Sequence, residues 1–298
     1  MVGWLASLLG FGIAIIGYQA NSSAGHVILT LGVAILSIGV LAGAGSQAVE
    51  RKAKGTEPYT GASPVFIFAA SIPMAYLGAV LLGAVMEASG GQVPGPVAEL
   101  ILIAIQGGAY IAVIALLVVG SGALTWREIG FRPGFRQAVE DLAWGALFAG
   151  PVIGLTIVVT AVLVAIFRVT PENPLPPTGS TSGLLLHLIA GAIVAPIAEE
   201  TLFRGVATTA WVRSLGVRAG IVRGALFFAF AHVLLIGGST VTEAFVIAFV
   251  AFVGRLPIAL VLGWLFVRRG SIYASIGLHA TFNGFLLVLA EVATRATG

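Results

Sequence analysis

The stretch GLLLHLIAGAIVAPIAEETLFRG, residues 183–205, is a long apolar run that ends in two adjacent glutamates and an arginine. An apolar run of roughly 20 residues is what a helix needs to cross the hydrocarbon core of a bilayer. Charged side chains are costly there, and by default they mark a functional site. The stretch therefore predicts a membrane-spanning helix that carries chemically active carboxylates at one end.

The whole chain has the composition of a membrane protein. Of its 298 residues 58% are hydrophobic and 9% are charged, whereas a soluble domain carries roughly 25% charged residues. The absence of cysteine excludes disulfides, thiolate metal sites and cysteine nucleophiles. The net charge of +3 is small and the arginines are scattered, so nucleic acid is not an expected partner.

Apolar segments long enough to cross a bilayer predict an all-α, polytopic transmembrane helical bundle of about eight or nine spans. The first segment lacks the basic region of a signal peptide and is counted as a span. GRLP, residues 254–257, is expected to kink or break the eighth segment. The nine segments are 2–19, 26–48, 65–87, 97–122, 143–167, 183–203, 219–236, 242–267 and 272–293.

The basic residues predict the orientation, because cytoplasmic loops carry an excess of lysine and arginine. Most of the 15 basic residues fall on alternate loops, which puts the N-terminus in the cytoplasm and the C-terminus outside. A prokaryotic plasma membrane is the expected location. The residues on those loops are Arg51, Lys52, Lys54, Arg127, Arg132, Arg136, Arg204, Arg213, Arg218, Arg223, Arg268 and Arg269.

No internal repeat or soluble domain interrupts this pattern. Residues 1–124 are predicted to be four N-terminal transmembrane helices of unknown role, and residues 125–298 a core of about five spans. Segment 126–144 mixes charged and aromatic residues, and is expected either to lie along the cytoplasmic interface or to form a solvated loop. Segment 168–183, rich in Pro, Ser, Thr and Gly, is expected to be an extended external loop.

Ionisable side chains lie inside the later spans. His232 lies in RGALFFAFAHV, and His279 lies in SIGLHATFNG with Asn283 one turn later. Taken singly, each would favour a helix–helix hydrogen bond. With Glu199 they come from three spans whose alternating directions let them meet in one cavity of the inner half of the bilayer. The other histidines, at a loop edge and near the outer surface, are weaker candidates; they are His26 and His187.

Helical spacing predicts the partners of the two glutamates. Glu200 and Arg204 are four residues apart on one face, with the acid first, so they can neutralise each other. Glu199 is rotated from Glu200 by about 100°, which leaves it free to face His232 and His279. Residues 199–204 are therefore not expected to face lipid.

Three short motifs carry a family resemblance. EETLFR at 199–204, FAFAH at 228–232 and HATFN at 279–283 match the patterns EExxxR, FxxxH and HxxxN. In this order, on late transmembrane helices, they resemble the motifs of the CPBP family, which includes the type II CAAX prenyl endopeptidases and prokaryotic relatives tied to bacteriocin processing and immunity. The resemblance covers about residues 180–290 and places a CPBP-type catalytic core in the C-terminal half.

The resemblance implies an intramembrane endopeptidase that acts on a membrane-associated peptide, such as a lipidated, CAAX-like tail. Glu199 would be the general base, and His232 would help to position and deprotonate a water. His279 and Asn283 would stabilise the oxyanion. This agrees with the needs of peptide hydrolysis, an activated water and donors aimed at the developing charge. The supporting residues would be Glu200, Arg204 and Phe228, whose ring is spaced to pack beside His232.

Composition removes other intramembrane proteases, but it leaves the role of metal open. Asp141 is the only aspartate, and neither HExxH nor GxSG occurs. Glu199, His232 and His279 form a two-histidine, one-carboxylate set that could hold Zn²⁺ with one position open for water. A metal-free mechanism without a cofactor is the favoured prediction, and zinc is the alternative.

Two interpretations without proteolysis remain. A transporter could use buried His and Glu to relay protons, but it would be expected to carry polar residues in the early spans too, and these are nearly all apolar. A non-catalytic subunit of a larger membrane complex could dock through the N-terminal helices. The expected partners are thus membrane lipids, a membrane-associated peptide or protein substrate, and partner membrane subunits.

Overall fold

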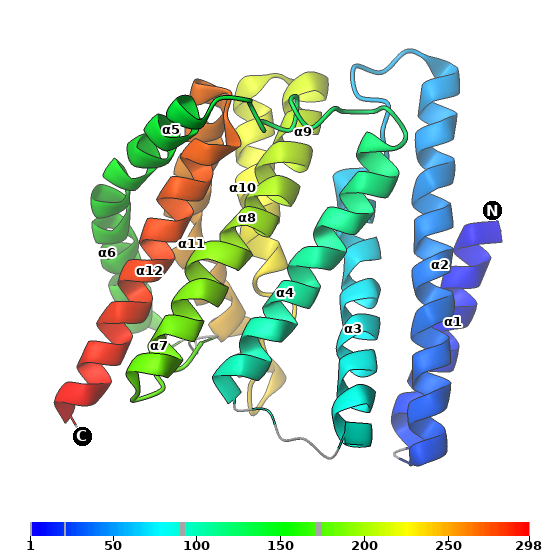
Figure 1. Ribbon diagram of the computed structural model, residues 1–298, viewed down its shortest axis with the longest axis horizontal. Coiled ribbons are helices and arrows are strands. Elements are labelled where there is room, and N and C mark those ends of the chain that lie inside the picture. Colours follow the sequence, from blue (N-terminus) through cyan, green and yellow to red (C-terminus); the bar gives the residue numbers. More distant parts are fainter. Residues whose placement is uncertain (1, 21, 90–92, 94, 171–174, 298) are drawn as a thin grey trace. The chain divides into compact units, whose positions relative to one another are not determined.

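The computed structural model describes residues 2–20, 22–89, 93, 95–170 and 175–297. Helices dominate this part of the chain, and no strand occurs within it. The predicted all-α fold is therefore confirmed. The chain forms two compact units, Met1–Trp126 and Arg127–Gly298 (Figure 1). The roles that the sequence analysis assigns to residues 1–124 and 125–298 stay predictions.

Eight helical segments of the described residues are long and apolar enough to cross a membrane. With the composition, they make the chain an integral, multi-pass membrane protein. The eight segments are Val2–Ala20, Ser23–Lys54, Pro64–Met86, Gly95–Val119, Phe135–Phe167, Thr181–Leu215, Val241–Arg269 and Ile272–Ala296.

The first unit consists of four long helices, and glycines let two of them pack closely. A Cβ atom at Gly39 would lie 2.8 Å from Ser7 Oγ, and one at Gly43 would lie 3.0 Å from a ring carbon of Trp4. Small residues at such a spacing allow helix backbones to approach within a bilayer. The elements of this unit are α1 (Val2–Ala20), α2 (Ser23–Lys54), α3 (Pro64–Ser89), α4 (Gly95–Ile114) and the π-helical segment η1 (Ala115–Val119).

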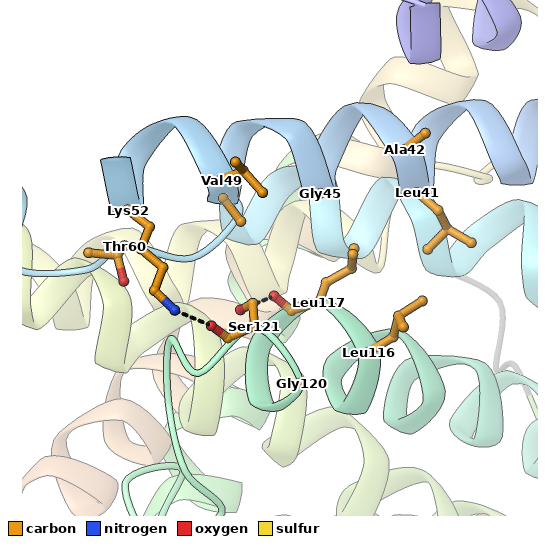
Figure 2. Close-up of a pocket in the computed structure, with 11 residues that line it drawn as sticks. Leu41, Ala42, Gly45, Val49, Lys52, Thr60, Leu116, Leu117, Gly120 and Ser121 are labelled. Carbon is orange, nitrogen blue, oxygen red and sulfur yellow. Dashed lines mark hydrogen bonds between the residues drawn. The ribbon is translucent and has the colours of Figure 1, made fainter. Parts of the chain in front are cut away.

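A largely apolar cavity of about 520 Å³ lies in this unit between α2 and η1. Figure 2 shows Leu41 and Leu116 toward one end of it and Lys52 toward the other, where the lysine Nζ donates to the Ser121 carbonyl at 3.3 Å. None of the predicted site residues lines this cavity. The chemistry predicted from the sequence therefore has to be sought in the second unit.

The second unit is built around a long rod of consecutive helical segments, Thr181–Leu215. Two of these segments are π-helical, a form that occurs mostly as short bulges, frequently at functional sites. The elements are α5 (Phe135–Leu147), α6 (Ala149–Phe167), the rod α7 (Thr181–Leu188), η2 (Ile189–Val194), α8 (Ala195–Glu200), η3 (Thr201–Thr208) and α9 (Thr209–Leu215), then α10 (Val217–Ala231), α11 (Val241–Arg269) and α12 (Ile272–Thr297).

Helices α6, α11 and α12 enclose an apolar core that includes Ile153, Leu262 and Leu278. Helix α5 packs directly on α12, because glycines at the contact leave room for the opposing backbone. Asp141 of α5, expected at an interface, is buried and accepts a hydrogen bond from Arg269 Nε at 2.8 Å. Residues from Phe135 onward are thus helical, so the solvated-loop alternative for 126–144 is wrong there. Their position along the membrane interface stays a prediction.

Two of the nine predicted spans differ from expectation. Helix α10 ends at Ala231 after 15 residues, about 22 Å of rise, which is short of the roughly 30 Å hydrocarbon core. Residues 232–240 follow it without regular helix. Helix α11, by contrast, is not broken at GRLP but continues through Pro257. Transmembrane helices tolerate proline because neighbouring groups satisfy the freed backbone.

The predicted external loop at 168–183 falls partly on residues 171–174, which lie outside the described residues. Its end is already helical, because α7 begins at Thr181. Ser180 caps that helix by accepting a hydrogen bond from the Gly183 N–H at 3.0 Å, as N-cap serines do. The rod that carries Glu199 therefore has a defined start.

Candidate active site

A turn at Gly216 brings two of the motifs to one level. The rod ends at Leu215, Gly216 adopts a φ of 82°, and α10 returns in the opposite direction. Glu199 precedes this turn by nearly the same number of residues as His232 follows it. Both helices rise by a similar amount per residue, so the two side chains meet at the same height.

Glu199 faces both motif histidines, as predicted from helical spacing. Its Oε2 atom lies 3.4 Å from His232 Nε2 and 3.8 Å from His279 Nε2. The side chain of Glu199 is 20% exposed and that of His232 is 27% exposed, whereas His279 is only 4% exposed. Glu199 and His232 can thus be reached from outside the helix bundle, and His279 forms the inner wall.

The end of α10 fixes the orientation of the His232 ring. Its Nδ1 lies 2.8 Å from the Phe228 carbonyl. Because a carbonyl oxygen only accepts hydrogen bonds, Nδ1 must carry the hydrogen. In the neutral ring this leaves an unprotonated Nε2 facing Glu199. The Phe228 ring lies 4.2 Å from the imidazole, which is the predicted packing of this pair.

Glu200 links the first and third motifs. Its Oε1 atom accepts from Arg204 Nη1 at 2.9 Å, which is the pair predicted from the i, i+4 spacing. The same oxygen accepts from His279 Nδ1 at 2.8 Å, a contact that the sequence analysis did not predict. Glu200 and Arg204 are fully buried, and Arg204 Nη2 also donates to the Ala259 carbonyl of α11 at 3.3 Å. Of the stretch 199–204 that was expected not to face lipid, Glu200 and Arg204 thus face the protein interior, whereas Glu199 is partly exposed.

Phe228 occupies the centre of this cluster. Its ring lies 4.2 Å from the Arg204 guanidinium and 5.7 Å from the His279 ring. A guanidinium over an aromatic face is attracted by the ring quadrupole, and the attraction is stronger away from water. Phe228 therefore holds the side chains of all three motifs against one apolar surface.

Asn283 is bound to backbone rather than to another motif residue. Its Nδ2 donates to the Gly191 carbonyl in η2 at 2.8 Å. That carbonyl is free because of Pro196: the Ala195 N–H bonds back to Ala190 in the π-helical register, and the next residue has no N–H to offer. Asn283 therefore satisfies an orphaned carbonyl, and one hydrogen of its amide remains for other partners.

The donor set of Glu199, His232 and His279 has the atom types of a zinc site, two imidazole Nε2 atoms and a carboxylate. Each ring also makes a hydrogen bond through Nδ1, as metal-binding histidines do. Among the described residues, however, no group of three His, Asp or Glu side chains is arranged to hold a metal ion. The atom types of these three side chains fit zinc, but their arrangement in the structure does not.

The remaining histidines lie away from this cluster. His26 lies near the start of α2 in the first unit, and His187 is buried in α7, about three turns before Glu199 along the rod. Sequence reasoning overlooked one charged residue of α11, Arg255, although a lone arginine within a long apolar segment is visible in the sequence.

The three motifs all fall within one family match. A family model described as "Type II CAAX prenyl endopeptidase Rce1-like" matches residues 181–285. This region is an Rce1-like domain. The resemblance to the CPBP family inferred from the motifs is thereby confirmed. Neither a curated protein nor a solved structure matches the chain. The Rce1-like domain begins with α7, ends within α12 and lies inside the second unit.

Proposed function

We propose that the Rce1-like domain is an intramembrane endopeptidase that hydrolyses a peptide bond of a membrane-associated substrate. The observation that carries the proposal is the position of one carboxylate oxygen of Glu199 opposite the Nε2 atoms of two histidines. The family match supports protease chemistry of the CAAX type. A lipidated or strongly apolar peptide is the substrate class that such a domain would meet in the bilayer.

Water activation falls to Glu199 and His232. Their separation of 3.4 Å leaves room for a water beside both groups, and neither side chain is fully buried. A water there donates one hydrogen to the carboxylate and the other to the Nε2 lone pair. Glu199 takes the first proton as the water oxygen attacks the carbonyl carbon, and that proton then passes to the leaving amine.

His279 and Asn283 are suited to the oxyanion. Because His279 donates from Nδ1 to Glu200, it can also donate from Nε2 only when its ring is doubly protonated. An imidazolium would bring the charge of the buried set Glu199, Glu200 and Arg204 to zero. The second amide hydrogen of Asn283 provides a further donor. Removing one oxyanion donor typically costs about 10²–10³ in rate.

Zinc is the alternative for the same residues. When bound by Glu199, His232 and His279, a zinc ion would supply Lewis-acid activation of its water. The Nδ1 hydrogen bonds of both rings are compatible with either mechanism. The metal-free proposal is favoured because no three-ligand arrangement occurs among the described residues. The two proposals differ in their response to a chelator.

The test is cleavage of a panel of membrane peptides by the purified full chain in liposomes. Glu199→Gln and His232→Ala are compared with Glu140→Gln, an exposed glutamate of the same unit paired with Arg136. The two site variants should lose at least 10²-fold in rate, as expected for a general base, and the control should not change. Activity that survives a chelator supports the metal-free mechanism, and loss with recovery on added zinc supports the metal.

The same experiment tests the alternative of a non-catalytic subunit. A folded wild type that cleaves no peptide and purifies with stable membrane partners would overturn the protease proposal. Equal rates for Glu199→Gln and wild type would overturn the assignment of the base.

A further inference from the structure

Arg255 is placed where an apolar helix should carry no charge. It lies at the midpoint of α11, Val241–Arg269, whose other charges are Glu243 in the first turn and Arg268 and Arg269 at the end. An arginine at the centre of a membrane-spanning helix is costly, so it faces the bundle interior or a water-filled cavity and marks a functional site by default. The side chain is half-buried.

Three other arginines of the second unit's helices show what a carboxylate partner looks like here. Arg204 pairs with Glu200, Arg269 with Asp141 and Arg295 with Glu291. For Arg255 the described residues provide no ion pair. Its guanidinium donates from Nη1 to the Ala251 carbonyl of its own helix at 2.9 Å, and this uses only one of its five N–H groups.

The position of Arg255 in the fold is tied to the candidate active site. Helix α11 touches the rod at Ala259, whose carbonyl accepts from Arg204, and Arg255 lies one turn earlier on the same face of α11. The rod and α11 run in the same direction, since α9 and the end of α11 lie at one end of the unit (Figure 1). One turn back along the rod from Arg204 leads to the glutamate pair.

The printed partners of Glu199 leave Arg255 available. The carboxylate of Glu199 lies within 4.0 Å of His232 and His279, and Arg255 is not among its ion-pair partners. By its place on α11 the guanidinium lies toward the glutamate pair, but it is not neutralised by Glu199. A flat, permanently charged fork of donors matches a carboxylate bidentately.

We propose that Arg255 is the binding site for a carboxylate of the peptide substrate, an inference that rests on the proposed endopeptidase function. The carboxylate is either the free C-terminus of the peptide or an acidic side chain, because an apolar membrane peptide has no other anion. Binding at Arg255 would set the distance between this carboxylate and the peptide bond that lies beside Glu199. The domain therefore selects a bond at a set distance from a carboxylate.

Peptide binding tests this without turnover. Full-length His232→Ala protein in nanodiscs is titrated with three fluorescent versions of one apolar peptide: a free C-terminus, a C-terminal amide, and an amide with one aspartate near the end. The version that supplies the recognised carboxylate should bind at least 10-fold tighter than the plain amide. Arg255→Gln should remove this preference, Arg255→Lys should retain part of it, and Arg223→Gln, an exposed arginine of α10, should leave it intact.

The outcomes separate this inference from the proposed function. The carboxylate site is overturned if protein that retains Arg255 binds all three peptides equally, or if Arg255→Gln keeps the same preference. If Arg255→Gln does not fold, the reduced preference of Arg255→Lys decides. Cleavage by protein that retains His232 gives the second readout. In this protein Arg255→Gln should raise KM for the preferred peptide and leave kcat within a few-fold. A preference in binding without any cleavage would support the site and refute the protease.

Discussion

One carboxylate oxygen organises the candidate site. Glu200 Oε1 accepts from both Arg204 and His279, so the glutamate that neutralises the buried arginine also orients an imidazole from another helix. A buried ion pair is weak evidence for stability in itself, because desolvation offsets the Coulombic gain. We therefore infer that the pair is retained for the orientation of His279.

Replacing one member of the Glu200–Arg204 pair and replacing both should have different effects on the free energy of unfolding, and the difference can be measured. Arg204→Gln removes one partner of the buried Glu200–Arg204 pair and should lower the free energy of unfolding by about 3–5 kcal/mol. The double variant Glu200→Gln, Arg204→Gln removes both charges and should recover most of that loss. Its activity should still fall, because a neutral amide oxygen accepts from His279 more weakly than the carboxylate does. Unfolding in detergent micelles followed by circular dichroism, together with peptide cleavage, measures both effects.

The exposed pair of Arg136 and Glu140 is the control. Its arginine side chain is 94% exposed, so Arg136→Gln should change the free energy of unfolding by at most about 1 kcal/mol. If Arg204→Gln proved no more destabilising than Arg136→Gln, Glu200 would not depend on Arg204 for its counter-charge.

At the scale of elements, the change from α- to π-helix in the rod links two motifs. In the π-helical register the Ala195 N–H donates to the Ala190 carbonyl. Pro196 has no N–H for the Gly191 carbonyl, which therefore accepts from Asn283. An unsatisfied buried carbonyl costs about 1–3 kcal/mol. The proline thus makes the rod dependent on a side chain of α12.

This dependence predicts coupling between Pro196 and Asn283. Asn283→Ala should destabilise the native chain by about 1–3 kcal/mol. It should cost less in a Pro196→Ala background, where the restored N–H can bond to Gly191. A double-mutant cycle on unfolding free energies should give a coupling of at least about 0.5 kcal/mol. The same cycle with Pro257→Ala, in α11, should be additive, and additivity in both cycles would refute the link.

The elements differ in how far the sequence predicts them. Hydropathy finds the long helices because each is apolar over a full bilayer thickness. It overestimates α10, since apolar residues continue from Val233 to Ile236 after the helix has ended. It cannot detect the π-helical segments, because a shift from i+4 to i+5 bonding leaves the composition unchanged.

The site shows the same division. Spacing within one helix predicts the Glu200–Arg204 and Phe228–His232 neighbours. The bonds of His279 to Glu200 and of Asn283 to Gly191 join residues 79 and 92 positions apart. Such contacts depend on how two distant helices are rotated against each other, which no local pattern specifies.

At the scale of the whole molecule, the short α10 does not change the predicted alternation. In the second unit the start of α5, the α9–α10 turn and the α11–α12 turn lie at one end (Figure 1). That end contains Arg213, Arg218, Arg268 and Arg269. Residues 217–240 must return the chain to the other end before α11 begins, so α10 and the irregular segment after it make this crossing together. Irregular backbone at that depth is tolerated where protein buries it or where it lines a cavity, and His232 opens this segment.

The predicted orientation can be tested directly because the chain has no cysteine. Ala24→Cys, at the exposed start of α2, and Ser214→Cys, at the exposed end of α9, each introduce one reactive thiol away from the candidate site. The excess of basic residues at the α9–α10 turn favours the cytoplasm for Ser214, and an odd number of crossings separates it from residue 24. An impermeant maleimide applied to intact cells should therefore label Ala24→Cys and spare Ser214→Cys, which should react only after permeabilisation. The reverse pattern would invert the molecule, and would place the α9–α10 turn and the basic end of α11 outside the cell. Labelling of both in intact cells would mean that an even number of crossings separates residues 24 and 214, contrary to the predicted spans.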